Sequence, residues 1–322
     1  MRKVYLNTLS ALAALVCMVI LALCTGCTAH RGVVSRDKAS LMERYRSGQP
    51  FFEDKGDSAG KDLNEEQLFE LGRRYRQQGR MESAFQQFCR ALAVNPEFLP
   101  ARYEKGIILL SRDMFQEALI EFQAVLEKEP GFAGAHEAAG RALFGAERYS
   151  EAEKHFLKAV ELDPDLKAPP RYLGVICNYQ GRYEQAETWF QAARGLCPKD
   201  GDVYNNLGVT YAMMGRYEDA VTAYRQAVDL GVRESRTYNN LALALFRLGR
   251  REQALEAFRC AGSEAAAYNN LGAACFLEGD FEGAISCFER AIELEPRFYV
   301  RAHENLKRAR LAVRFRDTAS VR

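Results

Sequence analysis

The 322-residue sequence has no excess of charge of either sign, since 44 lysines and arginines stand against 43 aspartates and glutamates. This balance gives no electrostatic argument for nucleic acid, and we expect no nucleic-acid partner. Histidine is scarce, and the four copies form neither an HExxH nor another zinc-binding pattern. The sequence also lacks GxSxG, P-loop and dinucleotide-binding fingerprints. It therefore indicates a protein that is not an enzyme and uses no metal or cofactor.

The N-terminal apolar run is shorter than the roughly 20 residues that a membrane-spanning helix needs. Residues 9–23 are apolar apart from Ser10, and they follow Arg2 and Lys3. A basic start, a short apolar core and small residues before the cleavage point are typical of a secretory signal peptide. We expect that signal peptide over residues 1–26.

The end of this segment, Thr25-Gly26-Cys27, resembles a bacterial lipobox, although Cys24 stands where the family usually has leucine. The resemblance implies cleavage before Cys27 and acylation of that cysteine, for example with palmitate. Thr28 follows, rather than the aspartate that holds enteric lipoproteins at the inner membrane, which favours the outer membrane. The alternative is an ordinary cleaved signal, or an uncleaved anchor, with a chance cysteine. Residues 27–64 are charged and aperiodic, and we interpret them as the acylated N-terminus and a tether.

A five-residue motif organises the rest of the chain. YNNLG at 204–208 returns as YNNLA at 238–242 and as YNNLG at 268–272, at spacings of 34 and 30 residues. A fixed period of this size is typical of a repeat architecture.

Seven repeats can be aligned on this period. Their ranges are 65–98, 99–132, 133–166, 167–200, 201–234, 235–264 and 265–298. They share a small residue at position 8, alanine at position 20, an aromatic ring at position 24 and a small residue at position 27. Each repeat is predicted to hold two helices that approach at the small residues, with the ring filling the space beside them. One such pair cannot bury its own apolar face, so the repeats must stack.

Between the two predicted helices lies a turn. In five repeats it contains a glycine, for which a left-handed backbone conformation is inexpensive: Gly79, Gly181, Gly215, Gly249 and Gly279. Repeat two departs from the pattern, with Arg102 and Lys105 at positions 4 and 7. Repeat six is four residues short, so its second helix should lose about one turn.

This pattern resembles the tetratricopeptide repeat family over residues 65–298. The resemblance implies an all-α, right-handed α-solenoid of helix-turn-helix repeats, whose first helices line a concave groove that binds extended peptides or partner segments. Residues 299–322 are expected to form a C-terminal capping helix, over roughly 299–314, followed by a basic, frayed tail.

Asparagines and two aromatic residues are the candidates for partner binding. The position-6 asparagines are similar to a ladder in the O-GlcNAc transferase repeat domain, which implies that they grip a peptide main chain through amide donors and acceptors. The alternative is that position 6 only follows the family pattern and that the position-5 asparagines bond between repeats. The full candidate set is Asn206, Asn240, Asn270, Asn205, Asn239, Asn269, Phe246 and Phe276.

The combined features predict a non-catalytic, lipid-anchored protein–protein interaction scaffold that faces the periplasm in a bacterial cell envelope. It resembles repeat lipoproteins of type IV and tight-adherence (Flp) pilus systems, which implies a role in pilus or secretin assembly. An adaptor for cell-wall hydrolases and a regulatory subunit of a transferase are the alternatives. The partner, the oligomeric state and any pairing of the six cysteines after Cys27 stay open.

Overall fold

The computed structural model describes residues 63–296 and 300–320. The expected signal peptide, Cys27 and almost all of the tether lie outside these residues. The described part of the chain forms fifteen helices and no strand, so the predicted all-α solenoid class is confirmed. The chain divides into two compact units at Gln180 and Gly181, here called the N-terminal unit and the C-terminal unit.

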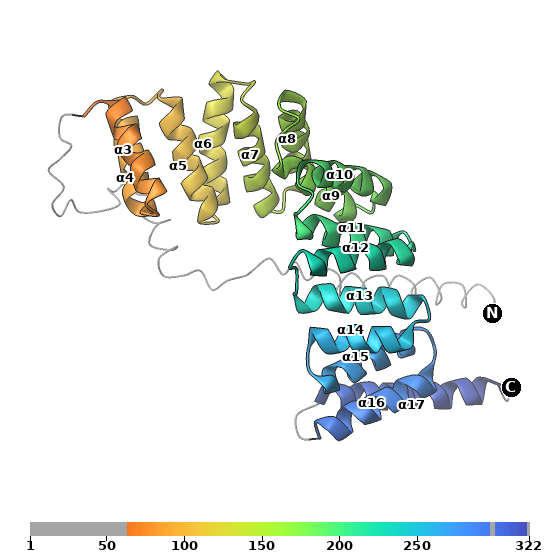
Figure 1. The fold of residues 1–322 in the computed structure, drawn as a ribbon. Helices are drawn as coiled ribbons and strands as arrows, with labels where there is room; N and C mark the ends of the chain where they lie inside the picture. The colour runs from red at the N-terminus through yellow and green to blue at the C-terminus, as the bar shows by residue number, and fades with distance from the viewer. Residues whose placement is uncertain (1–62, 297–299, 321–322) are drawn as a thin grey trace. The chain divides into compact units, whose positions relative to one another are not determined.

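The N-terminal unit contains three helical hairpins and one further helix, which follow one another along a stack (Figure 1). Its helices are α3 (Glu65–Gln77), α4 (Met81–Val94), α5 (Leu99–Ser111), α6 (Phe115–Lys128), α7 (Ala133–Gly145), α8 (Tyr149–Leu162) and α9 (Ala168–Tyr179). Each hairpin packs against the next because the two-helix element leaves an apolar face uncovered.

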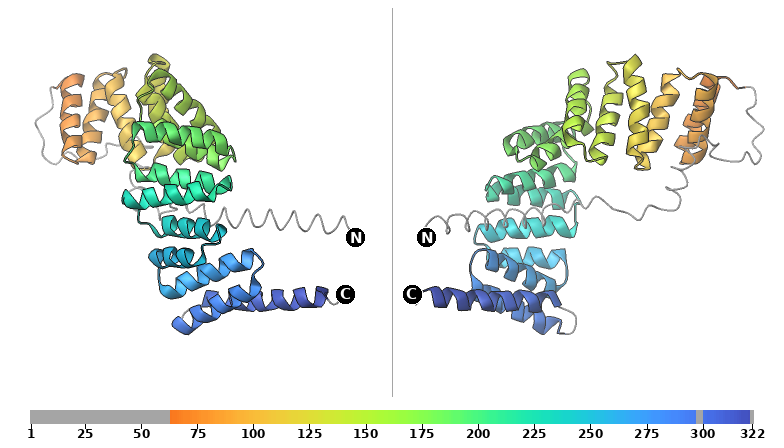
Figure 2. Two further views of the ribbon diagram at one scale, coloured as in Figure 1. Left: turned by 45° about the vertical axis from the view of Figure 1, so that its right-hand side comes forward. Right: turned by 180° about the vertical axis from the view of Figure 1, so that it is seen from behind.

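The C-terminal unit begins with one helix, continues through three hairpins and ends with a long helix (Figures 1 and 2). Its helices are α10 (Tyr183–Leu196), α11 (Gly201–Met213), α12 (Tyr217–Asp229), α13 (Ser235–Arg247), α14 (Arg251–Ala261), α15 (Glu264–Leu277), α16 (Phe281–Leu294) and α17 (Val300–Ser320). Helix α14 has 11 residues where α16 has 14, which is the shortening expected from the four missing residues.

The aromatic side chains at position 24 are all buried: Phe88, Phe122, Phe156, Phe190, Tyr224, Phe258 and Phe288. The position-8 glycines make room for them. A Cβ atom on Gly106 would lie 2.6 Å from Cε1 of Phe122, and one on Gly208 would lie 2.6 Å from the Tyr224 ring. Two helices can therefore approach closely only because one of them lacks a side chain at the contact.

The turns after the first helix of five repeats adopt the left-handed conformation that the glycines predicted, with φ between 73° and 82° at Gly79, Gly181, Gly215, Gly249 and Gly279. Repeats two and three make the same turn without glycine. Asp113 has φ 56° and Glu147 has φ 61°. The turn geometry is thus a property of the repeat and is kept even where the residue type makes it costly.

The last helix differs from the prediction. It was expected to end near residue 314 and to give way to a frayed tail, but α17 continues to Ser320. Residues 300–320 contain neither glycine nor proline. Arg310 pairs with Glu289 at 2.7 Å, and Arg316 pairs with Glu282, so two ion pairs tie this helix to α16. Ala302, Leu306 and Ala309 are buried, as expected for a helix that covers the last hairpin.

Candidate partner-binding surface

The asparagine motif occurs on three first helices of the C-terminal unit, α11, α13 and α15. Asn205 on α11 is 4% exposed, and its Oδ1 accepts a hydrogen bond from Oγ1 of Thr237 on α13, at 3.1 Å. Thr237 is also buried. A buried amide with a buried hydroxyl partner joins two successive hairpins, because neither group can turn to water.

A second set of amides connects α13, α15 and α17. Nδ2 of Asn270 donates to Oδ1 of Asn239 at 3.3 Å, and Nδ2 of Asn305 donates to Oδ1 of Asn269 at 3.0 Å. Asn269 also donates to Oδ1 of Asn270 at 3.5 Å, and its side chain is buried. These asparagines hold neighbouring helices together, which is the bonding that the structural alternative expected of position 5.

The position-6 asparagines of α11 and α13 have different surroundings. Asn240 is 5% exposed, and its buried Nδ2 has no hydrogen-bond partner among the described residues. Asn206 is half-buried. Its carbonyl accepts from Oγ1 of Thr210 at 2.9 Å, whereas its side-chain amide makes no hydrogen bond to the described part of the chain. Asn206 is therefore the partly exposed member of the motif whose amide is not already used.

The two predicted aromatic contacts separate in the same way. Phe246 is 4% exposed, and the guanidinium carbon of Arg251 lies 5.6 Å from its ring centroid. Its side chain belongs to the core between the hairpins, so it offers a partner little surface. Phe276 is half-buried, with its ring centroid 5.4 Å from that of Phe281. Phe276 is thus the accessible aromatic residue of the pair.

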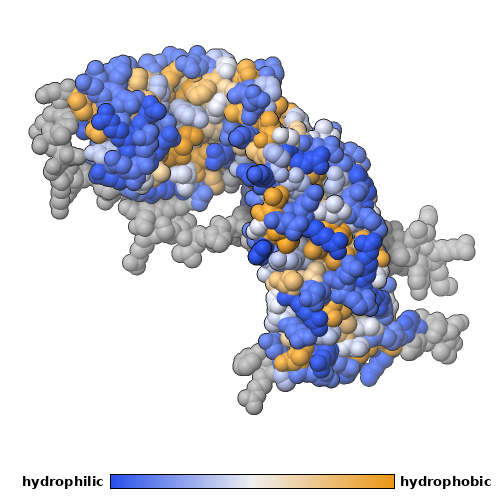
Figure 3. All heavy atoms as spheres, in the orientation of Figure 1, coloured by the Kyte–Doolittle hydropathy of each residue, from blue (hydrophilic) through white to orange (hydrophobic). Residues whose placement is uncertain are grey.

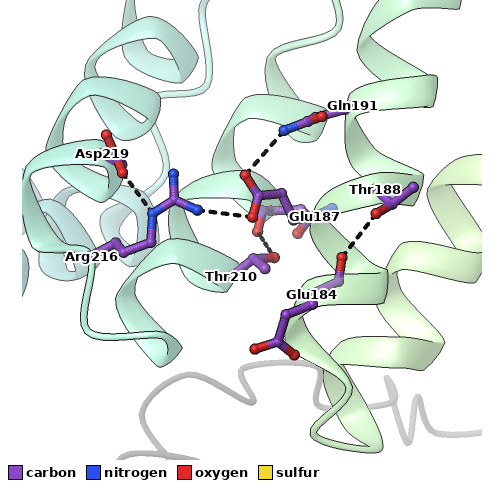
Figure 4. A network of polar contacts seen from close by, with 8 residues as sticks. Glu184, Glu187, Thr188, Gln191, Thr210, Arg216 and Asp219 are labelled. Carbon is purple, nitrogen blue, oxygen red and sulfur yellow. Dashed lines mark hydrogen bonds and ion pairs between the residues drawn. The ribbon is translucent and has the colours of Figure 1, made fainter.

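An ion-pair network joins α10 to the start of α12 (Figure 4). Nη1 of Arg216 donates to Glu187 at 2.9 Å, and its Nε donates to Asp219 at 2.7 Å. Gln191 donates to the same Glu187 at 3.0 Å. The guanidinium carbon of Arg216 lies 4.5 Å from the ring centroid of Tyr211, whose pKa is raised by burial. This network keeps successive helices in register, because one arginine bonds to two of them.

First helices of the N-terminal unit carry charged side chains instead of asparagines. Arg76 on α3 pairs with Glu104 on α5. On α7, Glu137 lies 3.9 Å from Arg141. Burial raises the pKa of both Glu104 and Glu137. The two units therefore present chemically different faces along the same repeat pattern.

Two histidines meet in the N-terminal unit, on α7 and α8. Nδ1 of His136 lies 3.2 Å from Nδ1 of His155, and Nε2 of His136 lies 3.1 Å from the carbonyl oxygen of Pro130. Burial lowers the pKa of His155, and the neighbouring His136 lowers it further. Across the described ranges, three or more histidine, cysteine or acidic side chains nowhere gather in an arrangement that could hold a metal ion.

A buried ion-pair cluster was not foreseen from the sequence. Glu121 is 3% exposed and pairs with Nζ of Lys105 at 2.8 Å and with Nη1 of Arg102 at 3.4 Å. Arg102 and Lys105 are the two residues of repeat two that depart from the pattern. The only signal was this coincidence of two unusual cations in one helix, and it did not point to Glu121 on the next helix.

Exposed apolar side chains are dispersed among hydrophilic ones on the face seen in Figure 3. Among the residues that the structure describes, the largest exposed fractions of big apolar side chains are those of Phe315, at 70%, and Val300, at 68%, both on α17. None of the helices that the structure describes is both long enough and apolar enough to cross a membrane.

Comparison with known proteins identifies the family. Three family models described as tetratricopeptide repeat match the chain, one over residues 170–231, one over 265–298, and one over 69–131, 103–167 and 205–261. Together they span most of the chain, which therefore belongs to the tetratricopeptide repeat family. No curated protein matches.

Two solved structures with TM-scores above 0.5 show the same fold, and a third has a TM-score below that value. A tetratricopeptide repeat protein from Parabacteroides merdae has a TM-score of 0.52 at 19% identity, covering 76% of this chain and 98% of its own. The Cut9-Hcn1 hetero-tetramer of APC/C has a TM-score of 0.51 at 18% identity, covering 79% and 50%. YrrB, described as a repeat protein with an unusual peptide-binding site, has a TM-score of 0.49 at 20% identity, covering 63% and 97%. These likenesses concern the fold alone.

Proposed function

We propose that this protein is a non-catalytic interaction scaffold that binds an extended segment of a partner protein along helices α11, α13 and α15. The observation that carries the proposal is the side-chain amide of Asn206, which is half-buried and makes no hydrogen bond to the described residues. An amide offers two donors and an acceptor, which suits the main chain of an extended peptide. The neighbouring asparagines are bonded between helices and keep that surface rigid.

The contact set of this proposal is smaller than the candidate set of six asparagines and two phenylalanines expected from the sequence. Asn206 supplies the hydrogen-bonding group on α11, and Phe276 supplies an apolar contact on α15. Asn205, Asn239 and Asn269 act indirectly, because they position the helices. A ligand that combines an exposed main chain with a hydrophobic side chain fits both contacts.

A phage-displayed library of unstructured peptides tests this proposal on the purified chain. We expect a recovered peptide to bind Asn206→Ala about 5-fold more weakly than wild type, since a hydrogen bond contributes roughly 0.5–1.5 kcal/mol. The control is Glu252→Ala, on the exposed surface of the second helix α14. If no peptide is recovered, or if Asn206→Ala and Phe276→Ala bind as wild type does, the proposed surface is wrong.

We propose further that Cys27 is acylated and anchors this scaffold to the outer membrane, facing the periplasm, where it assists pilus or secretin assembly. Several buried acyl chains anchor a protein durably, at about 0.8 kcal/mol for each CH2 group. Cys27→Ala should move the protein from the membrane fraction to the soluble fraction, and the wild type should incorporate labelled palmitate. A wild type that never takes up the label would contradict the anchor.

A further inference from the structure

Two cysteines meet inside the last hairpin of the C-terminal unit. Cys275 lies on α15 and Cys287 lies on α16, and the two thiols lie within hydrogen-bonding contact of each other. Both cysteines are free in the structure. The contact joins the two helices of one hairpin across a turn of only a few residues, so the two sulfur atoms are held near each other by the fold.

The close approach of the two helices explains why the sulfur atoms meet. Gly272 precedes Cys275 by about one helical turn on α15. A Cβ atom on Gly272 would lie 3.0 Å from Cβ of Cys287 and 2.8 Å from the Phe288 ring. The two helices are therefore in close contact one turn away from Cys275. A disulfide needs a similarly close approach of its own two Cβ atoms, roughly 3.5–4.5 Å apart.

The two thiols are not equivalent. Cys275 is 2% exposed, and its pKa is lowered, first by the hydrogen bond with Cys287 and also by the charge of Arg251. Cys287 is half-buried, and its pKa is raised by the same contact and by burial. Arg251 is held in place by Asp280 at 2.8 Å. The buried sulfur is thus the better nucleophile, and the more accessible sulfur is the one that an external reagent reaches.

We propose that Cys275 and Cys287 are a redox modification site that forms an intramolecular disulfide on reaction with a small disulfide-bearing oxidant such as oxidised glutathione. The Cys287 thiol first loses its proton, and the resulting thiolate attacks the oxidant, forming a mixed disulfide and releasing a glutathione thiolate that takes up a proton. The Cys275 thiolate then attacks the Cys287 sulfur and expels the second glutathione. Two thiols lose two electrons and two protons in total, and one oxidised glutathione becomes two reduced molecules.

The linkage would constrain the hairpin whose first helix carries Asn270 and Phe276. A disulfide acts mainly on the unfolded chain, whose loop it closes. The oxidised protein should therefore unfold at a temperature about 5 °C higher than the reduced protein, and a reductant should reverse the shift. The proposal does not depend on the nature of the partner.

Peptide mapping of the full chain tests the proposal. The protein is incubated with oxidised glutathione, the remaining thiols are alkylated, and the digest is analysed by mass spectrometry. We expect one cross-linked peptide pair that contains Cys275 and Cys287 and lacks the mass of two hydrogen atoms, and it should disappear after reduction. Cys260 is exposed on α14 and should not become linked to either of them.

Two variants distinguish the proposed order of steps. Cys275→Ala should retain glutathione on Cys287, because the resolving thiol is missing, whereas the matched control Cys260→Ala should form the linkage as wild type does. A stable glutathione adduct on Cys287 of the wild type, full alkylation of both thiols, or a linkage to another cysteine would overturn the proposal. If Cys275→Ala loses its helical circular dichroism and so does not fold, the peptide map of the wild-type protein is the test of the proposal.

Discussion

Glu121 shows how a single residue compensates for a departure from the repeat pattern. Repeat two has Arg102 and Lys105 where other repeats have aromatic or apolar residues, and both cations reach the buried Glu121 carboxylate. A buried carboxylate is costly unless it is paired, and the same is true of cations held beside it. Each of the three charged side chains therefore depends on the other two for its stability at this site.

Replacing Glu121 with alanine should lower the free energy of unfolding by about 2 kcal/mol, because it leaves two partly buried cations without their carboxylate. Urea titration followed by circular dichroism measures the change. The matched control is Glu151→Ala, which breaks the exposed pair with Arg148 and should leave stability almost unchanged. Equal losses in the two variants would show that the Glu121 cluster is no more important than a surface pair.

The histidine pair predicts a pH dependence. The folded-state pKa of His155 lies below its ordinary value of about 6.5, so the unfolded chain binds this proton more readily. The stability contribution of His155 is then fully present above about pH 6.5 and is lost as the pH falls towards the folded-state pKa. His155→Gln should lose less stability than wild type between about pH 7.5 and about pH 5.5. Urea titration of both proteins at the two pH values tests this prediction. Equal losses of unfolding free energy in wild type and His155→Gln would contradict it.

The sequence showed which positions of the motif are asparagines, but it did not show which of these asparagines are buried. Asn205 and Asn240 are buried although one stands at position 5 and the other at position 6, while Asn206 is half-buried. The burial of each amide depends on the helix that packs over it from the next hairpin. Identical motif letters therefore do not give identical contacts.

At the scale of the element, the turns were predictable and their exceptions were not. A glycine between two helical stretches indicates a left-handed residue, and five turns follow this rule. Asp113 and Glu147 adopt the same conformation without that signal, because the packing of their hairpins requires the turn. The tertiary contacts thus override the local preference of these two residues.

Replacing Glu147 with glycine should therefore raise the free energy of unfolding by about 0.5 kcal/mol, since relief of roughly 1–2 kcal/mol of left-handed strain exceeds the entropy that glycine loses on folding. The reverse change, Gly215→Ala, should lower stability by about 1 kcal/mol. Thermal and urea unfolding measure both variants. A Glu147→Gly variant less stable than wild type would mean that its side chain has a contact more valuable than the strain.

The C-terminal end of α17 shows that a local sequence pattern does not reveal contacts between residues far apart in the chain. The sequence predicted a capping helix that begins near residue 299, and Ala302, Leu306 and Ala309 are buried as a capping role requires. Where the helix continues beyond residue 309, Arg310 and Arg316 form ion pairs with α16. Such pairs join residues more than 20 positions apart, so a local pattern does not reveal them.

At the scale of the whole molecule, the fold class was predictable because the same residue types pack in the same way in each repeat. Small residues, buried rings and turn glycines recur together, and the tetratricopeptide repeat family follows from them. The accessible part of the binding surface was only partly predictable, since Phe246 and Asn240 lie in the core while Asn206 and Phe276 reach the surface. The positions that recur in every repeat determine the fold, and they do not identify the partner.

Site-specific photo-crosslinking in the native cell tests the central claim most directly. A photoreactive amino acid is placed in turn at Asn206, at Phe276 and at the control position Glu252, and the attached peptides are identified. We expect the first two positions to capture neighbouring residues of one extended segment of a single partner, and Glu252 not to capture it. Capture of that segment from Glu252 alone, or of unrelated proteins from Asn206 and Phe276, would contradict it.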